Sequence, residues 1–268
     1  GEIFVSYTED RGDDKTSTSI ARGFIENDSF SKIENIFQSG SSWNNIHWGS
    51  RLMFKDNLLY ASIGERGYGS VAQDPASYFG KMIRINKDGT APKDNPYSMN
   101  EDWLPEIYQI GLRNPQGIML YPNDSEIYIT NHGPRGGDFF GKVEAGTNYG
   151  WADVAWGGID YDGSIIGDGS AWKEGLLKPI YTWVPSIAVS DMTFYGGDLF
   201  PELKNKILVT SLKAQRLISL EFDGKKARNE TTLFEKVGRV RDVETNSAGE
   251  IYVIIDNEDS GIWKLVNK

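Results

Sequence analysis

The chain has 268 residues, 39% hydrophobic and 12% aromatic, so it can bury a substantial core and lacks a disordered composition. Its formal net charge of −10 argues against nucleic acid or an anionic membrane as a general partner. The absence of cysteine excludes disulfides and thiolate metal sites. No apolar run reaches the roughly 18 residues that a membrane-spanning helix requires.

A faint repeat organises the chain from its first residues onward. Short apolar, β-rich runs that each end in a polar loop recur at irregular intervals. The copies are "EIFVSYTED" at Ile3, "LLYASIGERG" at Leu59, "EIYITNHGPRG" at Ile127, "KILVTSLKAQR" at Ile207 and "EIYVIIDNEDSG" at Ile251. Further strands such as "KMIRIN" and "RLISLEF" lie between them, and no amphipathic helix of three turns is evident.

This pattern favours a single all-β domain, a β-propeller, over residues 1–268. Irregular periods with a strand and then a functional loop are typical of propeller blades, whereas a sandwich would show evenly spaced short strands. Equivalent strands in a propeller lie near its axis, and the loops after them gather at one end. Five copies permit five blades.

These loops and their neighbouring segments carry the candidate reactive side chains. His47 with Glu65 forms a possible pair of base and orienting acid, because a carboxylate fixes the tautomer of an imidazole. Several cations recur in an acidic protein, and side by side without a counter-ion they would repel, which indicates an anionic ligand with several oxygens. The cations are Arg113, Lys213, Arg239 and Arg241.

The glycine-rich stretch "NHGPRGGD", residues 131–138, follows a predicted strand. Its backbone can approach a ligand closely, and its carbonyl oxygens suit a hard cation such as Ca²⁺. Ordinary alternatives remain for each feature. A lone histidine is often structural, an Arg-x-Arg pair is often a solvated strand face, and a glycine-rich stretch is a turn by default.

Five motifs in one order resemble the soluble quinoprotein sugar dehydrogenases, the enzymes that depend on pyrroloquinoline quinone (PQQ) and have a six-bladed propeller. The motifs are "GLRNPQG", "NHGPRGGD", "GTNYGWADVAWG", "WVPSIAVS" and "GRVRDV". The resemblance runs from Ile3 to the C-terminus. It implies oxidation of the C1 hydroxyl of an aldose such as glucose to a lactone, with PQQ and Ca²⁺ as cofactors and an external electron acceptor.

Roles follow from motif position. The resemblance implies that His47 is the general base, that Glu65 orients it, and that Arg113 lies beside the quinone carbonyl that receives hydride. Asn114 and His132 are implied as further cofactor contacts. The positions implied to hold Ca²⁺ through main-chain oxygens are Gly133 and Pro134. The residues implied to bind the carboxylates and quinone oxygens of PQQ are Lys213, Arg239 and Arg241.

The chain departs from this family at several positions. The opening blade of the family has no counterpart, so an incomplete or five-bladed propeller is expected. Phe139 stands where the family has a glutamate, so we do not expect a second, structural calcium. The alternative function is a non-catalytic propeller that binds a protein or glycan, and a calcium-dependent lactonase is a third. The zero cysteine count fits a periplasmic or extracellular location, and no signal peptide is evident.

Overall fold

The computed structural model describes residues 1–258 and 260–266. Within these ranges the regular structure comprises eighteen β-strands and two short 3₁₀ helices, and no helix there is long and apolar enough to cross a membrane. The chain forms two compact units. The first comprises Gly1–Pro115, Glu144–Val154 and Trp172–Leu177, and the second comprises Gln116–Val143, Ala155–Ala171 and Lys178–Lys268.

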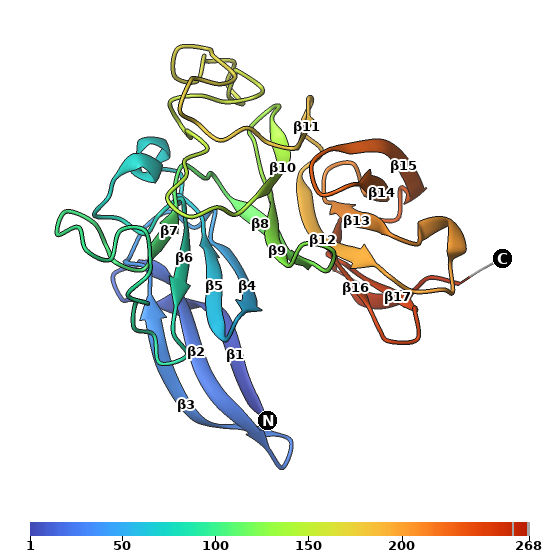
Figure 1. The fold of residues 1–268 in the computed structure, drawn as a ribbon, viewed down its shortest axis with the longest axis horizontal. Coiled ribbons are helices and arrows are strands. Elements are labelled where there is room, and N and C mark those ends of the chain that lie inside the picture. Colours follow the sequence, from blue (N-terminus) through green and yellow to red (C-terminus); the bar gives the residue numbers. More distant parts are fainter. Residues whose placement is uncertain (259, 267–268) are drawn as a thin grey trace. The chain divides into compact units, whose positions relative to one another are not determined.

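The first unit contains two antiparallel meanders in which sequence neighbours pair (Figure 1). The first meander is β1 (Glu2–Asp10), β2 (Thr16–Glu26) and β3 (Ser29–Gln38). The second is β4 (Gly49–Lys55), β5 (Leu58–Ile63), β6 (Lys81–Ile85) and β7 (Ile107–Gln109), with the 3₁₀ helix η1 (Gly69–Gln73) between β5 and β6.

The second unit contains three more meanders of the same kind. They are β8 (Pro115–Tyr121), β9 (Glu126–Asn131), β10 (Asp138–Lys142) and β11 (Tyr181–Trp183); β12 (Val189–Tyr195), β13 (Lys206–Ser211), β14 (Arg216–Phe222) and β15 (Ala227–Glu235); and β16 (Val240–Thr245), β17 (Ile251–Ile255) and β18 (Gly261–Lys264). The 3₁₀ helix η2 (Pro201–Leu203) precedes β13. Five meanders therefore match the five predicted copies.

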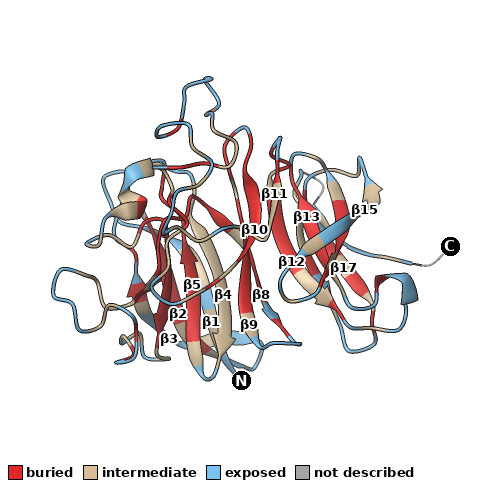
Figure 2. Cartoon of the chain, turned by 45° about the horizontal axis from the view of Figure 1, so that its top comes forward, coloured by how far each residue is buried: buried red, intermediate tan, exposed pale blue. Residues whose placement is uncertain are grey.

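Four of the predicted copies are the second strands of their meanders, namely β5, β9, β13 and β17. In β5, β9 and β13 every residue after the first is buried, as the red strands β5 and β13 in Figure 2 show. A strand covered on both faces reads as a continuous apolar run rather than an alternating one. Burial on both faces therefore explains why these strands were visible in the sequence.

Apolar side chains from neighbouring meanders make the core within each unit. In the first unit Ile20 packs with Leu59, Ile63 and Ile83, all fully buried. In the second unit Tyr121 packs on Phe222 and donates a 3.1 Å hydrogen bond to its carbonyl oxygen. Each such side chain contributes about 1.5–3 kcal/mol by leaving water.

In three meanders the penultimate residue of the second strand has a buried hydroxyl group. This hydroxyl forms a hydrogen bond with the first strand of a meander. Ser62 accepts the N–H of Arg51 at 3.0 Å, and Thr210 accepts the N–H of Asp191 at 2.8 Å. Thr130 donates to the carbonyl of Ser190 at 2.5 Å. The pairing register shifts near the start of β4, β12 and β16, as at a β-bulge. Bulges re-aim the neighbouring side chains, so they shape the strand ends where loops meet.

Lys81, the first residue of β6, is fully buried and ties the η1 segment to the sheet. Its ammonium donates hydrogen bonds to the carbonyls of Val71 at 3.0 Å, Ala72 at 2.9 Å and Phe79 at 2.9 Å. Three donors thus meet three acceptors, which satisfies a buried cation with main-chain oxygens alone. The Lys81 side chain therefore connects the η1 segment to strand β6.

Burial lowers the pKa of Lys81 to about 7, with a smaller opposing effect of Asp74. The unfolded chain holds this proton up to its ordinary pKa of 10.5, so between about pH 7 and 10.5 the unfolded state binds more protons. We expect the free energy of unfolding to rise with pH by roughly 2 kcal/mol between pH 7 and 9. Urea unfolding of the wild type and of Lys81→Met at both pH values measures this, since the variant lacks the titrating group. Equal pH dependence in both proteins would contradict the expectation.

Candidate functional site

The predicted site residues share one position in the topology. In an antiparallel meander the end of the second strand and the start of the first strand lie at the same end of the sheet, measured along the strands. In the first unit His47 precedes β4, Glu65 follows β5, and Arg113 and Asn114 precede β8. In the second unit the corresponding ends of the sheets carry the remaining predicted residues, which are His132, Gly133, Pro134, Lys213, Arg239 and Arg241.

His47 and Glu65 are in direct contact in the first unit. The Nδ1 atom of His47 lies 2.5 Å from Oε1 of Glu65, whose side chain is only 2% exposed. The other carboxylate oxygen accepts the N–H of Gly69, in η1, at 2.8 Å. With Nδ1–H donated to the carboxylate, Nε2 carries a lone pair. Nε2 bonds to no other described residue, and the His47 side chain is 17% exposed, so it can accept a proton.

The backbone of His47 is held in a special conformation. Its φ of +52° lies in the left-handed region, which costs a non-glycine residue about 1–2 kcal/mol. Gly64 makes this possible, because a Cβ there would lie 1.9 Å from the carbonyl oxygen of His47. The N–H of Gly64 also donates to the carbonyl of Trp48 at 3.1 Å. Gly64 therefore lies against the main chain of both His47 and Trp48.

Arg113 and Asn114 are connected to the same group of residues. The carbonyl of Arg113 accepts the N–H of Glu65 at 2.9 Å, and Oδ1 of Asn114 accepts the N–H of Gly49 at 3.1 Å. Arg113 is 5% exposed, and its guanidinium lies 5.4 Å from the ring centre of Trp151. The structure thus brings together four of the predicted residues, all within the first unit.

Two indole N–H groups of the first unit are available to a ligand. Nε1 of Trp48, next to His47, and Nε1 of Trp151, next to the Arg113 guanidinium, are buried and have no hydrogen-bond partner among the described residues. An unsatisfied buried donor is costly, so such groups mark places where an acceptor binds. An oxygen-rich ligand such as PQQ fits this chemistry.

In the second unit the loop after β9 is anchored by a buried carboxylate. Asp138 accepts the N–H of Gly133 at 2.8 Å and the N–H of Val189, at the start of β12, at 3.1 Å. Burial raises the pKa of Asp138, opposed by these hydrogen bonds. Nε2 of His132 bonds to the carbonyl of Val189. His132 therefore holds its own loop, and its role as a cofactor contact stays a prediction.

The glycines of this loop are required by close packing. A Cβ on Gly133 would lie 2.5 Å from the carbonyl oxygen of Gly136. Pro134 is buried, and its carbonyl oxygen accepts no hydrogen bond from a residue in the described ranges. A main-chain carbonyl without a donor suits a hard cation, so this observation fits the Ca²⁺ role implied for Pro134.

Arg239 and Arg241 have a counter-ion that the sequence analysis missed. One oxygen of Asp256 lies 3.5 Å from Nε of Arg239 and 2.5 Å from Nη2 of Arg241, and Arg241 holds the pKa of Asp256 below its usual range. The expectation of unneutralised charge at these two residues is therefore wrong. The acid lies within the predicted copy "EIYVIIDNEDSG", directly after its apolar run, which was the available signal.

Arg241 and Lys213 differ in the partners that they have. Arg241 also donates to Oε1 of Gln116 at 3.1 Å, and its carbonyl accepts the Ser190 hydroxyl at 2.6 Å. Lys213 is exposed, and its ammonium bonds to no described residue. The Lys213 ammonium therefore has capacity for an anionic ligand.

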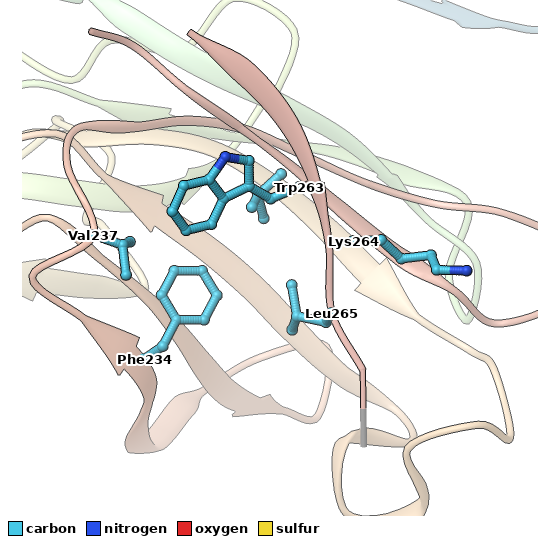
Figure 3. Close-up of a pocket in the computed structure, with 6 residues that line it drawn as sticks. Phe234, Val237, Trp263, Lys264 and Leu265 are labelled. Atoms are coloured by element: carbon cyan, nitrogen blue, oxygen red, sulfur yellow. The ribbon is translucent and has the colours of Figure 1, made fainter. Parts of the chain in front are cut away.

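Two further features of the second unit were not predicted. The carboxylate oxygens of Asp191, Asp242 and Glu244, on β12 and β16, lie within 4.8 Å of one another. A small apolar pocket of about 150 Å³ lies against the third meander of this unit (Figure 3). It contains none of the predicted site residues, and its lining is Phe234, Val237, Val253, Trp263, Lys264 and Leu265.

Known proteins share this sequence and fold. Residues 1–264 match the family described as Glucose / Sorbosone dehydrogenase. The aldose sugar dehydrogenase YliI of Escherichia coli (strain K12) is 33% identical over 270 residues, 98% of this chain and 72% of that protein. Quinoprotein glucose dehydrogenase B of Acinetobacter calcoaceticus is 31% identical over 185 residues, 59% of this chain and 37% of that protein.

A solved structure described as glucose dehydrogenase superposes with a TM-score of 0.95 at 30% identity, covering 100% of this chain and 79% of that one. This match confirms the predicted all-β propeller fold, with five blades in the chain. The family match, nearly end to end, confirms the resemblance found in the five motifs. The chain therefore belongs to the glucose/sorbosone dehydrogenase family of quinoprotein sugar dehydrogenases.

Proposed function

We propose that this chain oxidises the C1 hydroxyl of aldose sugars to lactones with PQQ and Ca²⁺ as cofactors. The observation that carries the proposal is the His47–Glu65 pair, in which the carboxylate contacts Nδ1 and leaves Nε2 without a hydrogen-bond partner among the described residues. A carboxylate-oriented imidazole is the arrangement that general-base catalysis uses. Family membership supports the reaction class.

In this proposal His47 takes the proton of the C1 hydroxyl through Nε2 as the C1–H bond breaks and the lactone carbonyl forms. Glu65 keeps the imidazole in the tautomer that can accept this proton and stabilises the imidazolium that results. Bound PQQ supplies the two-electron oxidant, and Ca²⁺ supplies a Lewis acid for the quinone oxygen. The positive charge of Arg113 would stabilise the negative charge that develops on the quinone oxygen.

The remaining residues of the proposal hold the cofactor. Main-chain oxygens of Gly133 and Pro134 would hold Ca²⁺, and Asn114 and His132 would be further contacts. The planar forks of arginine match carboxylates, and PQQ carries three of them. Asp256 would fix the orientation of two of these forks before the ligand arrives. The cations assigned to the carboxylates and quinone oxygens are Lys213, Arg239 and Arg241.

The reduced cofactor requires an external electron acceptor, and we propose that the enzyme works in the periplasm or outside the cell. A chain without cysteine is unaffected by an oxidising compartment, which supports this location. Fractionation of the native host with an antibody against this chain would test it. Recovery in the cytoplasm alone would contradict this part of the proposal.

Reconstitution tests the proposed reaction. Purified protein is mixed with PQQ and CaCl₂, and reduction of a dye is followed with a panel of aldoses and with myo-inositol, which has no anomeric hydroxyl. We expect dye reduction with at least one aldose, none with myo-inositol, and loss of the activity after Ca²⁺ is chelated. A protein that binds PQQ but oxidises no aldose would favour the non-catalytic alternative.

A further inference from the structure

Arg66 is a fully buried arginine next to Glu65, and every hydrogen bond that we find for its guanidinium goes to an oxygen without formal charge. Nε donates to the carbonyl of Ile46 at 2.9 Å, and Nη2 donates to Oγ1 of Thr16 at 2.8 Å and to the carbonyl of Asn44. Nη1 donates to the carbonyl of Thr16 at 3.4 Å. Burying a guanidinium in this way is costly, so its position calls for an explanation.

The contacts of Arg66 lie on both sides of His47. Ile46, whose carbonyl it binds, precedes His47, and Trp48, whose ring centre lies 5.0 Å from the guanidinium, follows it. A planar fork and a cation–π contact together fix the direction of the main chain. His47 itself has a φ of +52°, a conformation that persists only where neighbouring contacts enforce it.

Two consecutive residues therefore hold one loop by two different means. Glu65 binds the side chain of His47, and Arg66 binds the backbone around it. Arg66 has a φ of +60°, so its own backbone is also in the left-handed region. A change at Arg66 should consequently alter the orientation of His47 without removing any atom of the imidazole or of its carboxylate partner.

We propose that Arg66 is a positioning residue that fixes the backbone from Asn44 to Trp48 and thereby sets the orientation of His47. This inference depends on the proposed function at one point, the role of His47 as the base. The structural claim is that the buried guanidinium controls the orientation of the His47 imidazole. It does not require the cofactor, so it can be measured in the cofactor-free protein.

Arg84 provides a matched control within the same unit. It is also buried, its guanidinium lies 4.9 Å from the ring centre of Tyr108, and its Nε donates to Oδ1 of Asn95 at 2.6 Å. Unlike Arg66 it also forms an ion pair, with Asp94 at 2.8 Å, and none of the hydrogen bonds described for it reaches the loop of His47. Replacing either arginine by lysine keeps the charge and removes the planar fork.

The experiment uses the two histidines of the chain as reporters in the cofactor-free protein. Imidazole NMR signals of His47 and His132 are recorded for the wild type, Arg66→Lys and Arg84→Lys, and are assigned with His47→Gln. We expect Arg66→Lys to shift the His47 signals and to speed solvent exchange of its Nδ1 proton, while the His132 signals stay in place. Arg84→Lys should leave both sets unchanged.

Kinetics on the reconstituted enzyme complete the test. Arg66→Lys should lower kcat by about 10–100-fold, as expected for a supporting residue, and leave PQQ affinity within about twofold of the wild type. If Arg66→Lys does not fold, Thr16→Val removes one acceptor of the guanidinium, together with the 3.2 Å hydrogen bond from the Thr16 hydroxyl to Oδ1 of Asn45, and should give a smaller shift at His47 alone.

Unmoved His47 signals in Arg66→Lys, or in Thr16→Val where that variant replaces it, would overturn the proposal. Equal changes at His47 and His132 would also overturn it, because they would indicate a general structural role. A wild type that oxidises no sugar would refute the proposed function and leave the NMR result on Arg66 standing.

Discussion

His47→Ala is expected to bind PQQ and Ca²⁺ as the wild type does and to lose turnover by about 10²–10⁴-fold, the usual contribution of a general base. The reason is that in the proposed mechanism Nε2 accepts the proton, while the Glu65 carboxylate contacts Nδ1. The measurement is kcat with an aldose and a dye at saturating cofactor, alongside a spectroscopic titration of PQQ.

Glu65→Gln is the companion variant, since it keeps the shape of the side chain and removes its charge. We expect turnover between that of the wild type and that of His47→Ala, because an amide can still orient the imidazole but cannot stabilise an imidazolium. If His47→Ala instead abolishes PQQ binding with turnover per bound cofactor unchanged, His47 is a cofactor ligand and the assignment as base is wrong.

Gly64→Ala is expected to reduce turnover by about 10²-fold while the protein remains folded. A Cβ at this position would lie 1.9 Å from the carbonyl oxygen of His47 and 2.5 Å from its carbonyl carbon, so the backbone of His47 must move. Displacement of a catalytic group by about 1 Å can cost this much, because proton transfer requires hydrogen-bond distance. The measurement is kcat, with circular dichroism and thermal unfolding to verify the fold.

Gly261→Ala is the control for this substitution. The nearest atoms to a Cβ at Gly261 belong to Trp263, at 3.5 Å, and the position has no positive φ. We expect wild-type turnover from this variant. Unchanged kcat in Gly64→Ala would show that the loop can accommodate the methyl group, and that the close contact does not determine the position of His47.

The fold was predictable where strands are buried on both faces. Such strands carry an apolar run, and β5, β9 and β13 have a buried Ser or Thr at the penultimate position and are followed by a polar loop. The three-residue strands β7 and β11 carry no such run and were not recognised. Their formation depends on pairing with β6 and β10, which a local pattern does not record.

The candidate site was predictable only to the level of strand ends. His47 and Glu65 could be paired on their chemistry, an imidazole with a carboxylate that can orient it, and the structure places them in contact. Asp256 was missed as the partner of Arg239 and Arg241, since a residue after a strand can turn its side chain toward either face. The carboxylates of Asp191 and Glu244 meet through the packing of β12 on β16, which the sequence does not specify.

The most direct test of the central claim is a deuterium isotope effect on the first reductive turnover. The protein loaded with PQQ and Ca²⁺ is mixed rapidly with an aldose deuterated at C1 or, as the control, at C6, and reduction of the bound cofactor is followed. We predict a several-fold slower reduction with the C1-deuterated sugar, no slowing with the C6-deuterated sugar, and a lactone as product. Equal rates for both sugars, or no reduction by any aldose, would contradict hydride removal from C1 assisted by His47.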